Sequence, residues 1–172
     1  MNDYGVVTAP DTVRIERLMP GPIERLWSYL TDSEKRRTWM AAGEIELHPG
    51  GRVEHVFRNS ELTNDDPAPA KYPEQEYRSE GRVIDCDPPH RLSYTWDGSS
   101  EVVFELSPRQ DRVLLVVTHR RLPNRDELVS VAGGWHTHLD VLLDLLEGRT
   151  PRHFWSKHGR IEAEYERRIP AP

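Results

Sequence analysis

The sequence predicts an α+β fold in which a curved antiparallel sheet of about six or seven strands packs against a long C-terminal helix. Two observations predict this class. Short segments of alternating apolar residues recur between residues 12 and 119 and are separated by turn residues. After them, residues 124–147 place leucine, valine and tryptophan at helical spacing. Strands followed by a long terminal helix are typical of a layered domain in which the helix covers one face of the sheet.

Composition limits the class of protein further. The 172 residues suit one domain, 1–172. A hydrophobic fraction of 36% and a net charge of −6 indicate a polar, acidic surface and argue against nucleic acid as a partner. The one cysteine, Cys86, excludes a disulfide within the chain and a zinc site of several cysteines. Residues 1–10 lack a signal-peptide pattern and no segment is apolar for the roughly 20 residues that span a bilayer, so we expect a cytoplasmic protein with no membrane partner.

Residues 12–39 predict a strand followed by two helices. The segment 12–18 alternates as a strand does. Pro22 suits the first turn of a helix, because proline lacks an N–H that this turn leaves unpaired anyway. The apolar residues that follow have helical spacing: Ile23, Leu26, Trp27 and Leu30. Thr31 or Asp32 can cap a second short helix that runs through Trp39.

Six further strand segments are expected between residues 44 and 119. They are 44–47, 52–58, 77–86, 91–98, 100–107 and 112–119, with turns at 48–51, 87–89 and 108–111. Alternation in the last three places one set of side chains on a common face: Leu92, Tyr94, Trp96, Val102, Phe104, Leu106, Val113, Leu115, Val117 and His119. This face is the one that we expect to turn toward the helix.

Residues 59–76 form a polar stretch rich in proline and acidic residues. The stretch is long for a hairpin loop, which favours either a mobile lid or a disordered insertion. Within it, Asp65 and Asp66 could bind a cation or could belong to a solvated loop.

The long C-terminal helix is predicted to begin at Asn124 and to stop at Gly148. Asn124 and Glu127 have the pattern of a capping box, and glycine commonly ends a helix. Gly133 and Gly134 would weaken the helix by about 1 kcal/mol each relative to alanine, so close packing or a kink has to explain them. A further helix is expected at about 151–168, with one buried stripe made of Phe154, His158, Ile161 and Tyr165.

Two histidines of the long helix are candidate functional residues. His136 and His138 lie two positions apart and point in opposed directions. A regular helix cannot aim both at one metal ion, and we expect no metal site. His136 falls on the expected polar face with Thr137 and Asp140, and can pair with Asp140. His138 falls inside the apolar arc, either as a satisfied histidine at the edge of the core or as a polar group in a pocket.

Five stretches together resemble a known family. They are IERLMPGPIERLWSYLTDSEKRRTWM, HPGGRVE, EGRVIDCDPPHRLSYTW, VVTHRRL and GGWHTHLDVLLDLL. In this order they resemble the START-like, or SRPBCC, superfamily and, within it, the heat-shock-protein ATPase activator homologues. The resemblance covers a core of about residues 12–147 and implies a helix-grip fold, with a cavity between the sheet and the long helix. The chain departs from the pattern at 59–76 and after Gly148, where either segment could cover the cavity mouth or form a subunit contact.

Strand parity and the helix arc give the candidate residues of a ligand-binding cavity. They are Trp39, Phe57, Tyr94, Trp96, Phe104, Leu115, Val117, Trp135, His138, Leu139 and Leu142. We expect Trp39 to close one end of the cavity. The Tyr94 hydroxyl and His138 are expected to orient a ligand, with His55 and His119 as further candidates. The alternative is that these side chains form a packed core with no cavity.

Three functions remain open. The first is binding of a small apolar or aromatic molecule, such as a lipid, a polyketide or a phenolic compound, with no cofactor. The second is an enzyme of the cyclase or hydratase type, in which His138 or His119 would be the acid–base group. The third is an interaction module that activates a chaperone ATPase and docks a basic protein partner, or forms a homodimer.

Overall fold

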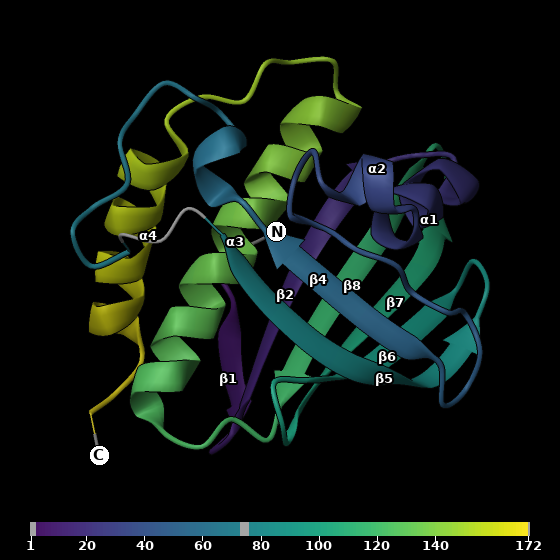
Figure 1. Cartoon of the computed structure of the whole chain (residues 1–172), viewed down its shortest axis with the longest axis horizontal. Helices are drawn as coiled ribbons and strands as arrows, with labels where there is room; N and C mark the ends of the chain where they lie inside the picture. Colours follow the sequence, from purple (N-terminus) through teal and green to yellow (C-terminus); the bar gives the residue numbers. More distant parts are fainter. Residues whose placement is uncertain (1–2, 73–75, 172) are drawn as a thin grey trace.

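A computed structural model describes residues 3–72 and 76–171. Among these residues, eight strands form one antiparallel sheet in the order β1-β2-β8-β7-β6-β5-β4-β3. The sheet curves around α3, and α4 packs against α3 (Figure 1). The elements are, in chain order, β1 (Val6–Ala9), β2 (Thr12–Pro20), α1 (Ile23–Thr31), α2 (Ser33–Arg36), β3 (Ala41–Ala42), β4 (Arg52–Phe57), the 3-10 helix η1 (Asn59–Glu61), β5 (Tyr77–Asp87), β6 (Arg91–Trp96), β7 (Ser100–Arg109), β8 (Arg112–Arg120), α3 (Arg125–Leu146) and α4 (Phe154–Arg168). The helix-grip architecture is confirmed, with eight strands rather than six or seven.

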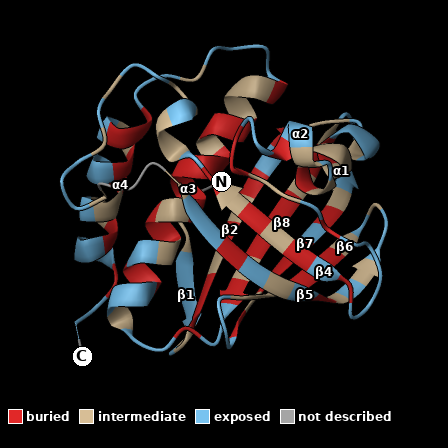
Figure 2. Cartoon of the chain, viewed as in Figure 1, coloured by how far each residue is buried: buried red, intermediate tan, exposed pale blue. Residues whose placement is uncertain are grey.

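The inner face of the sheet is built from alternating residues of β6, β7 and β8, as predicted. The register places Phe104 opposite Val117 and Leu106 opposite Leu115. All side chains predicted for this face are buried except Trp96, which is half-buried. Figure 2 shows buried and less buried residues interleaved along these strands. The alternation of apolar residues in the sequence therefore predicted correctly which side chains of these strands turn toward α3.

Both ends of α3 lie where the sequence predicts. The Asn124 side chain accepts a hydrogen bond from the Glu127 N–H at 2.9 Å, which caps the first turn. At the other end Gly148 adopts a φ of +76°, a left-handed conformation that glycine reaches without strain. The Arg149 N–H then bonds the Asp144 carbonyl at 2.8 Å, which closes the last turn. Local chemistry therefore sets the length of this helix.

The face of α3 that was expected to be polar is in part buried, and that prediction was wrong. His136 and Thr137 are 5% and 0% exposed, because α4 covers this face (Figure 1). The His136 Nδ1 lies 2.8 Å from the Tyr165 hydroxyl of α4, and its Nε2 lies 3.8 Å from the Asp140 carboxylate. A Cβ added at Gly133 would lie 3.5 Å from α4, so this glycine lies at the contact between the helices.

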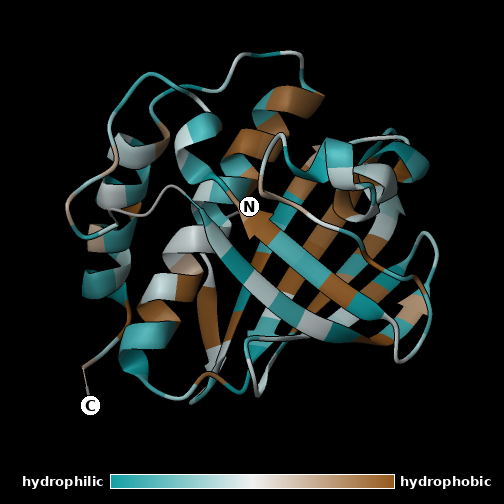
Figure 3. Cartoon of the chain, viewed as in Figure 1, coloured by the Kyte–Doolittle hydropathy of each residue, from teal (hydrophilic) through white to brown (hydrophobic). Residues whose placement is uncertain are grey.

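The second C-terminal helix, α4, uses its predicted stripe. The buried residues of this stripe include Phe154, His158, Ile161 and Tyr165. The helix begins at Phe154 rather than near residue 151, because His153 adopts a left-handed φ of +58°. Its remaining surface is mostly hydrophilic (Figure 3), as a helix that covers another helix requires.

Three features of the sheet differ from the prediction. The strand expected at 44–47 is not formed, since within it Ile45 makes an isolated bridge to Val53 and β3 takes the sheet edge instead. The edge strand β1 was missed because its residues are largely exposed and show no apolar alternation. The turn expected at 108–111 is shorter, since Pro108 pairs with Val113 at the end of β7.

The short helix α2 also ends earlier than expected. It starts after Asp32, whose side chain accepts from the Lys35 N–H at 3.0 Å, so Asp32 rather than Thr31 is the cap. It ends at Arg36 rather than Trp39, since the chain turns there and buries Trp39 completely in the core.

The stretch expected to be a lid or a disordered insertion packs against α4. Residues 59–72, here called the strap, run beside α4 (Figure 1), and residues 73–75 lie outside the described residues. Lys71 and Tyr72 both bond Glu162 of α4, Tyr72 through its hydroxyl at 3.1 Å. These contacts argue against a disordered insertion for the strap.

The strap also caps the N-terminus of α4. The first N–H groups of a helix have no partner inside it. The hydrogen bonds that satisfy them run from the His153 N–H to Asp65 (2.8 Å), from the Phe154 N–H to Thr63 (3.1 Å), and from the Trp155 and Ser156 N–H groups to Asp66 (3.3 and 2.8 Å). Two carboxylates at this end also interact favourably with the helix dipole. The helix start is therefore stabilised by residues about ninety positions earlier in the chain.

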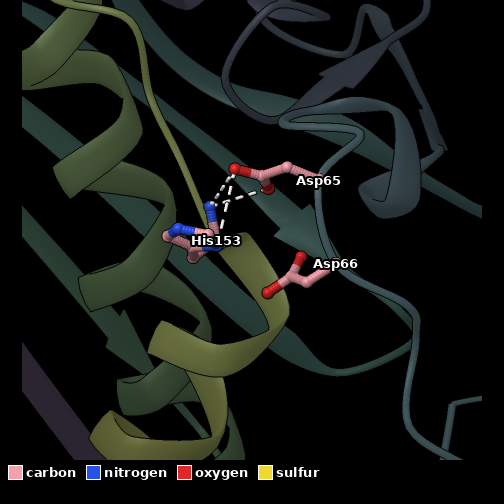
Figure 4. Close-up of side chains that lie close together, drawn as sticks. All are labelled: Asp65, Asp66 and His153. Atoms are coloured by element: carbon pink, nitrogen blue, oxygen red, sulfur yellow. Dashed lines mark hydrogen bonds and ion pairs between the residues drawn. The ribbon is translucent and has the colours of Figure 1, made fainter.

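The same carboxylates lie close to a histidine in a group that could hold a metal ion. Ligand atoms of Asp65, Asp66 and His153 lie within 4.8 Å of one another (Figure 4). The oxygens of both carboxylates accept backbone N–H groups of α4, as the dashed lines show for Asp65. Helix capping therefore accounts for the presence of two carboxylates here.

Replacing Asp66 with alanine should weaken the contact between the strap and α4. Loss of a helix cap costs about 1 kcal/mol, so we expect the free energy of unfolding to fall by about that amount. The first-turn amides of α4 should exchange faster with solvent. Urea unfolding and hydrogen exchange measure the two effects. Glu61→Ala, which removes an exposed carboxylate of the same strap, is the matched control, and equal effects of the two variants would contradict the capping role.

Candidate functional site

A cavity of about 510 Å³ lies between one end of the sheet, the N-terminal half of α3, the strap and the start of α4. This volume is typical of sites that bind small molecules. Aromatic side chains form much of the wall: Phe57, Tyr72, Tyr77, Trp96, Trp135 and Trp155. Gly134 also lies on the wall, and a Cβ added there would meet nothing within 4 Å. The alternative of a packed core without a cavity is therefore not what the structure shows.

Only part of the predicted set of ligand-binding residues lies on the cavity wall. Those on its wall are Phe57, Trp96, Trp135 and His138. Those in the core and not on the wall are Trp39, Tyr94, Phe104, Leu115, Val117, Leu139 and Leu142. The second group is at most 1% exposed, because the middle of the sheet and α3 approach closely and large side chains fill the space between them. The role of the first group in binding stays a prediction.

The sequence predicts that Trp39 closes one end of the cavity, but the structure does not place Trp39 on the cavity wall. Its indole N–H donates to the Tyr29 carbonyl at 2.8 Å and the side chain is fully buried in the core. The next residue, Met40, lies on the wall instead.

Sequence reasoning missed the wall residues that the strap and α4 provide. The rings of Tyr72 and Trp155 stack with centroids 5.5 Å apart and planes at 23°. The Trp155 indole N–H donates to the Ser60 hydroxyl at 3.1 Å, which joins α4 to the strap. Both segments had been noted as departures from the family pattern. Their aromatic residues were the available signal that they complete a wall.

His119 lies on the wall as a fully hydrogen-bonded, neutral histidine. Its Nδ1 accepts from the Trp135 indole N–H at 3.0 Å, so the ring proton is on Nε2. That N–H donates to the Ser100 hydroxyl at 3.0 Å, and the hydroxyl donates to the Trp96 carbonyl at 2.7 Å. Burial lowers the pKa of His119 to about 4, although the Asp97 charge acts in the opposite direction. Both ring nitrogens are engaged, and His119 positions the Trp135 ring.

The sequence left open whether His138 is a satisfied histidine at the edge of the core or a polar group in a pocket, and the structure shows features of both. Its Nδ1 donates to the Trp39 carbonyl at 2.8 Å, which leaves Nε2 as the lone-pair nitrogen. Burial lowers the pKa of His138 to about 4, against the effect of this hydrogen bond, so the ring is neutral at pH 7. One nitrogen is thus satisfied by the core, and the ring lies on the cavity wall.

His55 and Tyr94 had been expected to orient a ligand, but they lie beneath the wall. The Tyr94 hydroxyl lies 3.3 Å from the His55 Nε2, and the pair links β4 to β6. Burial and the nearby Arg36 charge lower the pKa of His55 to about 3. The guanidinium of Arg36 is itself buried and donates to backbone carbonyls, including that of Ala41 at 3.0 Å. This cluster therefore holds the core together below the cavity.

Acidic residues lie at the mouth of the cavity. The Tyr77 hydroxyl donates to Asp97, and the Ser79 hydroxyl donates to the same carboxylate at 2.8 Å. Burial raises the pKa of Tyr77 to about 12, and the hydrogen bond to Asp97 adds to this shift. Glu127, in the first turn of α3, is an exposed wall residue. The opening is therefore bordered by two carboxylates.

The chain also matches the model of a known protein family. The family model described as "Activator of Hsp90 ATPase homolog 1-like protein" matches residues 20–147, which confirms the resemblance noted in the sequence. No curated protein matches the chain. Across the part of the chain that the structure describes, no helix has the length and apolar character needed to cross a membrane.

Solved structures share this fold. The protein encoded by gene BPP1335 from Bordetella parapertussis is 40% identical, with a TM-score of 0.83 over 99% of this chain and 92% of that chain. CalU16 from Micromonospora echinospora is 22% identical, with a TM-score of 0.68 over 93% of this chain and 89% of that chain. DynU16, a protein in the dynemicin biosynthetic locus, is 20% identical, with a TM-score of 0.65 over 84% of this chain and 51% of that chain. The last two are similar to this chain in fold.

Acid should destabilise the protein through its buried histidines. An unfolded histidine takes up a proton as the pH falls below about 6.5, whereas folded His119 stays neutral down to about pH 4. Stability that is present above pH 6.5 is therefore lost as the pH falls toward 4, by up to about 1.4 kcal/mol per pH unit for one such group. We expect the His119→Gln variant to lose roughly 1–2 kcal/mol less than the wild type between pH 7 and pH 5.

Urea unfolding at the two pH values measures this difference. His48→Gln, at an exposed histidine, is the control and should keep the pH dependence of the wild type. If His119→Gln also keeps it, His119 is not buried in its neutral form.

Proposed function

The chain belongs to the family of Activator of Hsp90 ATPase homolog 1-like proteins, and from this premise we propose that its cavity binds a small apolar or aromatic molecule. The observation that carries the proposal is an aromatic-walled cavity of about 510 Å³ at one end of a core that is elsewhere filled by side chains. A filled core is the normal state of a protein interior, so an unfilled region lined with large rings supports a binding role.

The affinity would come from burial of apolar surface. A ligand that buries about 200 Å² of apolar area against these rings would gain roughly 5 kcal/mol at about 25 cal/mol per Å². The lone-pair nitrogen of His138 would accept one hydrogen bond and so orient the ligand. DynU16, which shares the fold, is a protein in a biosynthetic locus, and this supports a small metabolite as the ligand.

Catalysis on the same scaffold has weaker support from the geometry. His119 has both ring nitrogens engaged, so it is not free to exchange a proton with a ligand. His138 has a pKa near 4, far below the value near 7 that suits an acid–base group at neutral pH. The family name refers to an ATPase activator, and a protein partner stays a prediction. No feature in residues 3–72 and 76–171 favours that role over ligand binding.

Filling the cavity from α3 should abolish binding while the fold is kept. Gly134→Leu places a side chain into open space on the wall and also removes a helix-weakening glycine. We expect the affinity for N-phenylnaphthylamine, a neutral aromatic fluorophore, to fall at least roughly tenfold while the melting temperature stays equal or rises. Fluorescence titration and thermal unfolding measure the two quantities.

Gly159→Leu is the matched control for this change. Gly159 lies in α4, is exposed and has nothing within 4 Å of an added Cβ, but it is not on the cavity wall. This variant should bind the fluorophore as the wild type does. Binding that survives Gly134→Leu, or that is absent in the wild type, would refute the proposed site.

A further inference from the structure

Most hydrogen-bond donors on the cavity wall are already engaged by the protein. The bonds run from Trp135 to His119, from Tyr72 to Glu162, from Trp155 to Ser60 and from Tyr77 to Asp97. The Lys71 ammonium, which also borders the cavity, binds Glu162 and lies 5.3 Å from the centre of the Tyr72 ring. A ligand therefore meets few donors, and no unpaired positive charge is found among the described wall residues.

Hydrogen-bond acceptors, by contrast, remain available. Asn59 lies on the wall, and its buried Oδ1 has no hydrogen-bond partner among the residues that the structure describes, which costs free energy. The His138 Nε2 is a second acceptor, and the carboxylates of Asp97 and Glu127 border the mouth. The wall donors for which no hydrogen bond is found in the described part of the chain are neutral: the Trp96 indole, the Ser130 hydroxyl and the Asn59 amide. This balance favours a ligand that donates hydrogen bonds.

The charge at the mouth favours a positive ligand. Asp97 and Glu127 both contribute to raising the pKa of Tyr77, after burial, so both carboxylates lie within electrostatic reach of that side chain. Lys71, the cationic side chain found among the described wall residues, is paired with Glu162. The whole chain carries a net charge of −6, which attracts cations toward it.

The rings beside these carboxylates suit a cation as well as an apolar body. Phe57 lies with its centroid 5.9 Å from that of Tyr77 and 5.8 Å from that of Trp96, and Trp96 lies 5.6 Å from Trp135. Ring faces attract a cation within about 6 Å, and tryptophan does so most strongly. A cluster of such rings next to carboxylates is an arrangement that recognises organic ammonium groups.

We propose that the ligand of this cavity is an organic cation: an amine, protonated at neutral pH, that carries an aromatic or apolar body. Its ammonium group would lie at the mouth near Asp97 and Glu127, and its body would pack against Trp96 and Trp135. This inference rests on the proposed function, because it names the chemical class of the molecule bound at the same site.

Three probes with one ring system and different charges test the inference. Naphthylmethylamine is a cation at pH 7.4, naphthylmethanol is neutral and naphthoate is an anion. We expect isothermal titration calorimetry to show the amine binding roughly tenfold or more tighter than the alcohol, with the carboxylate weakest. The preference should shrink at high salt, because the mouth carboxylates are open to solvent.

Amide variants then locate the charge that selects the amine. Asp97→Asn combined with Glu127→Gln keeps the shape of both side chains but removes both charges, and should bring the amine to the affinity of the alcohol. The new amide at position 97 can accept from one of the Tyr77 and Ser79 hydroxyls and donate to the other, so both contacts can be kept. Asp97 has a positive φ of 39°, which asparagine tolerates well, so the fold should be retained. Asp126→Asn, in the same first turn of α3 but not on the wall, is the matched control and should keep the preference.

The outcomes separate the two proposals. Equal binding of all three probes, tighter binding of the alcohol or the carboxylate, or a preference for the amine that survives loss of both carboxylates would overturn the cation proposal and leave the binding cavity standing. Binding of none of the probes by the wild type, together with no binding of N-phenylnaphthylamine, would overturn both.

Discussion

The outer wall of the cavity depends on one long-range contact, the capping of α4 by the strap. The N–H groups at the start of α4 cannot be satisfied inside the helix, and the chain supplies their partners from Thr63, Asp65 and Asp66. Because this contact fixes both segments, it also brings Tyr72 and Trp155 together as stacked rings on the wall. The sheet and α3 alone would leave that side of the cavity without these rings.

A second constraint is that the buried polar groups of the core must be satisfied. A series of hydrogen bonds runs from Trp135 through His119 and Ser100 to the Trp96 carbonyl, and it links α3 to the end of the sheet. It also holds the Trp135 indole in place relative to the Trp96 backbone without any charge. Neutral histidines thus serve the packing of this site, and the charges that a ligand would meet lie at the mouth.

The two helices at the C-terminal end show why a face of a helix is harder to assign than its ends. The ends of α3 follow from Asn124 and Gly148, which act on their own backbone neighbourhood. The face with His136 and Thr137 is buried because a separate helix lies on it. Polar residues on that face are compatible with either solvent or a hydrogen-bonding partner such as Tyr165, so periodicity could not distinguish the two.

The sequence by itself determined the α+β class, most of the strands, the ends of α3 and the side chains that turn inward, because these follow from local periodicity and from capping residues. It also determined the family, through short motifs in a fixed order. The tertiary structure decided which inward residues leave a space: Phe57, Trp96 and Trp135 border the cavity, whereas Phe104 and Leu139 fill the core. The physical reason is that a cavity depends on the separation of elements distant in the chain. Here that separation is set by where the strap and α4 pack, which no local pattern records.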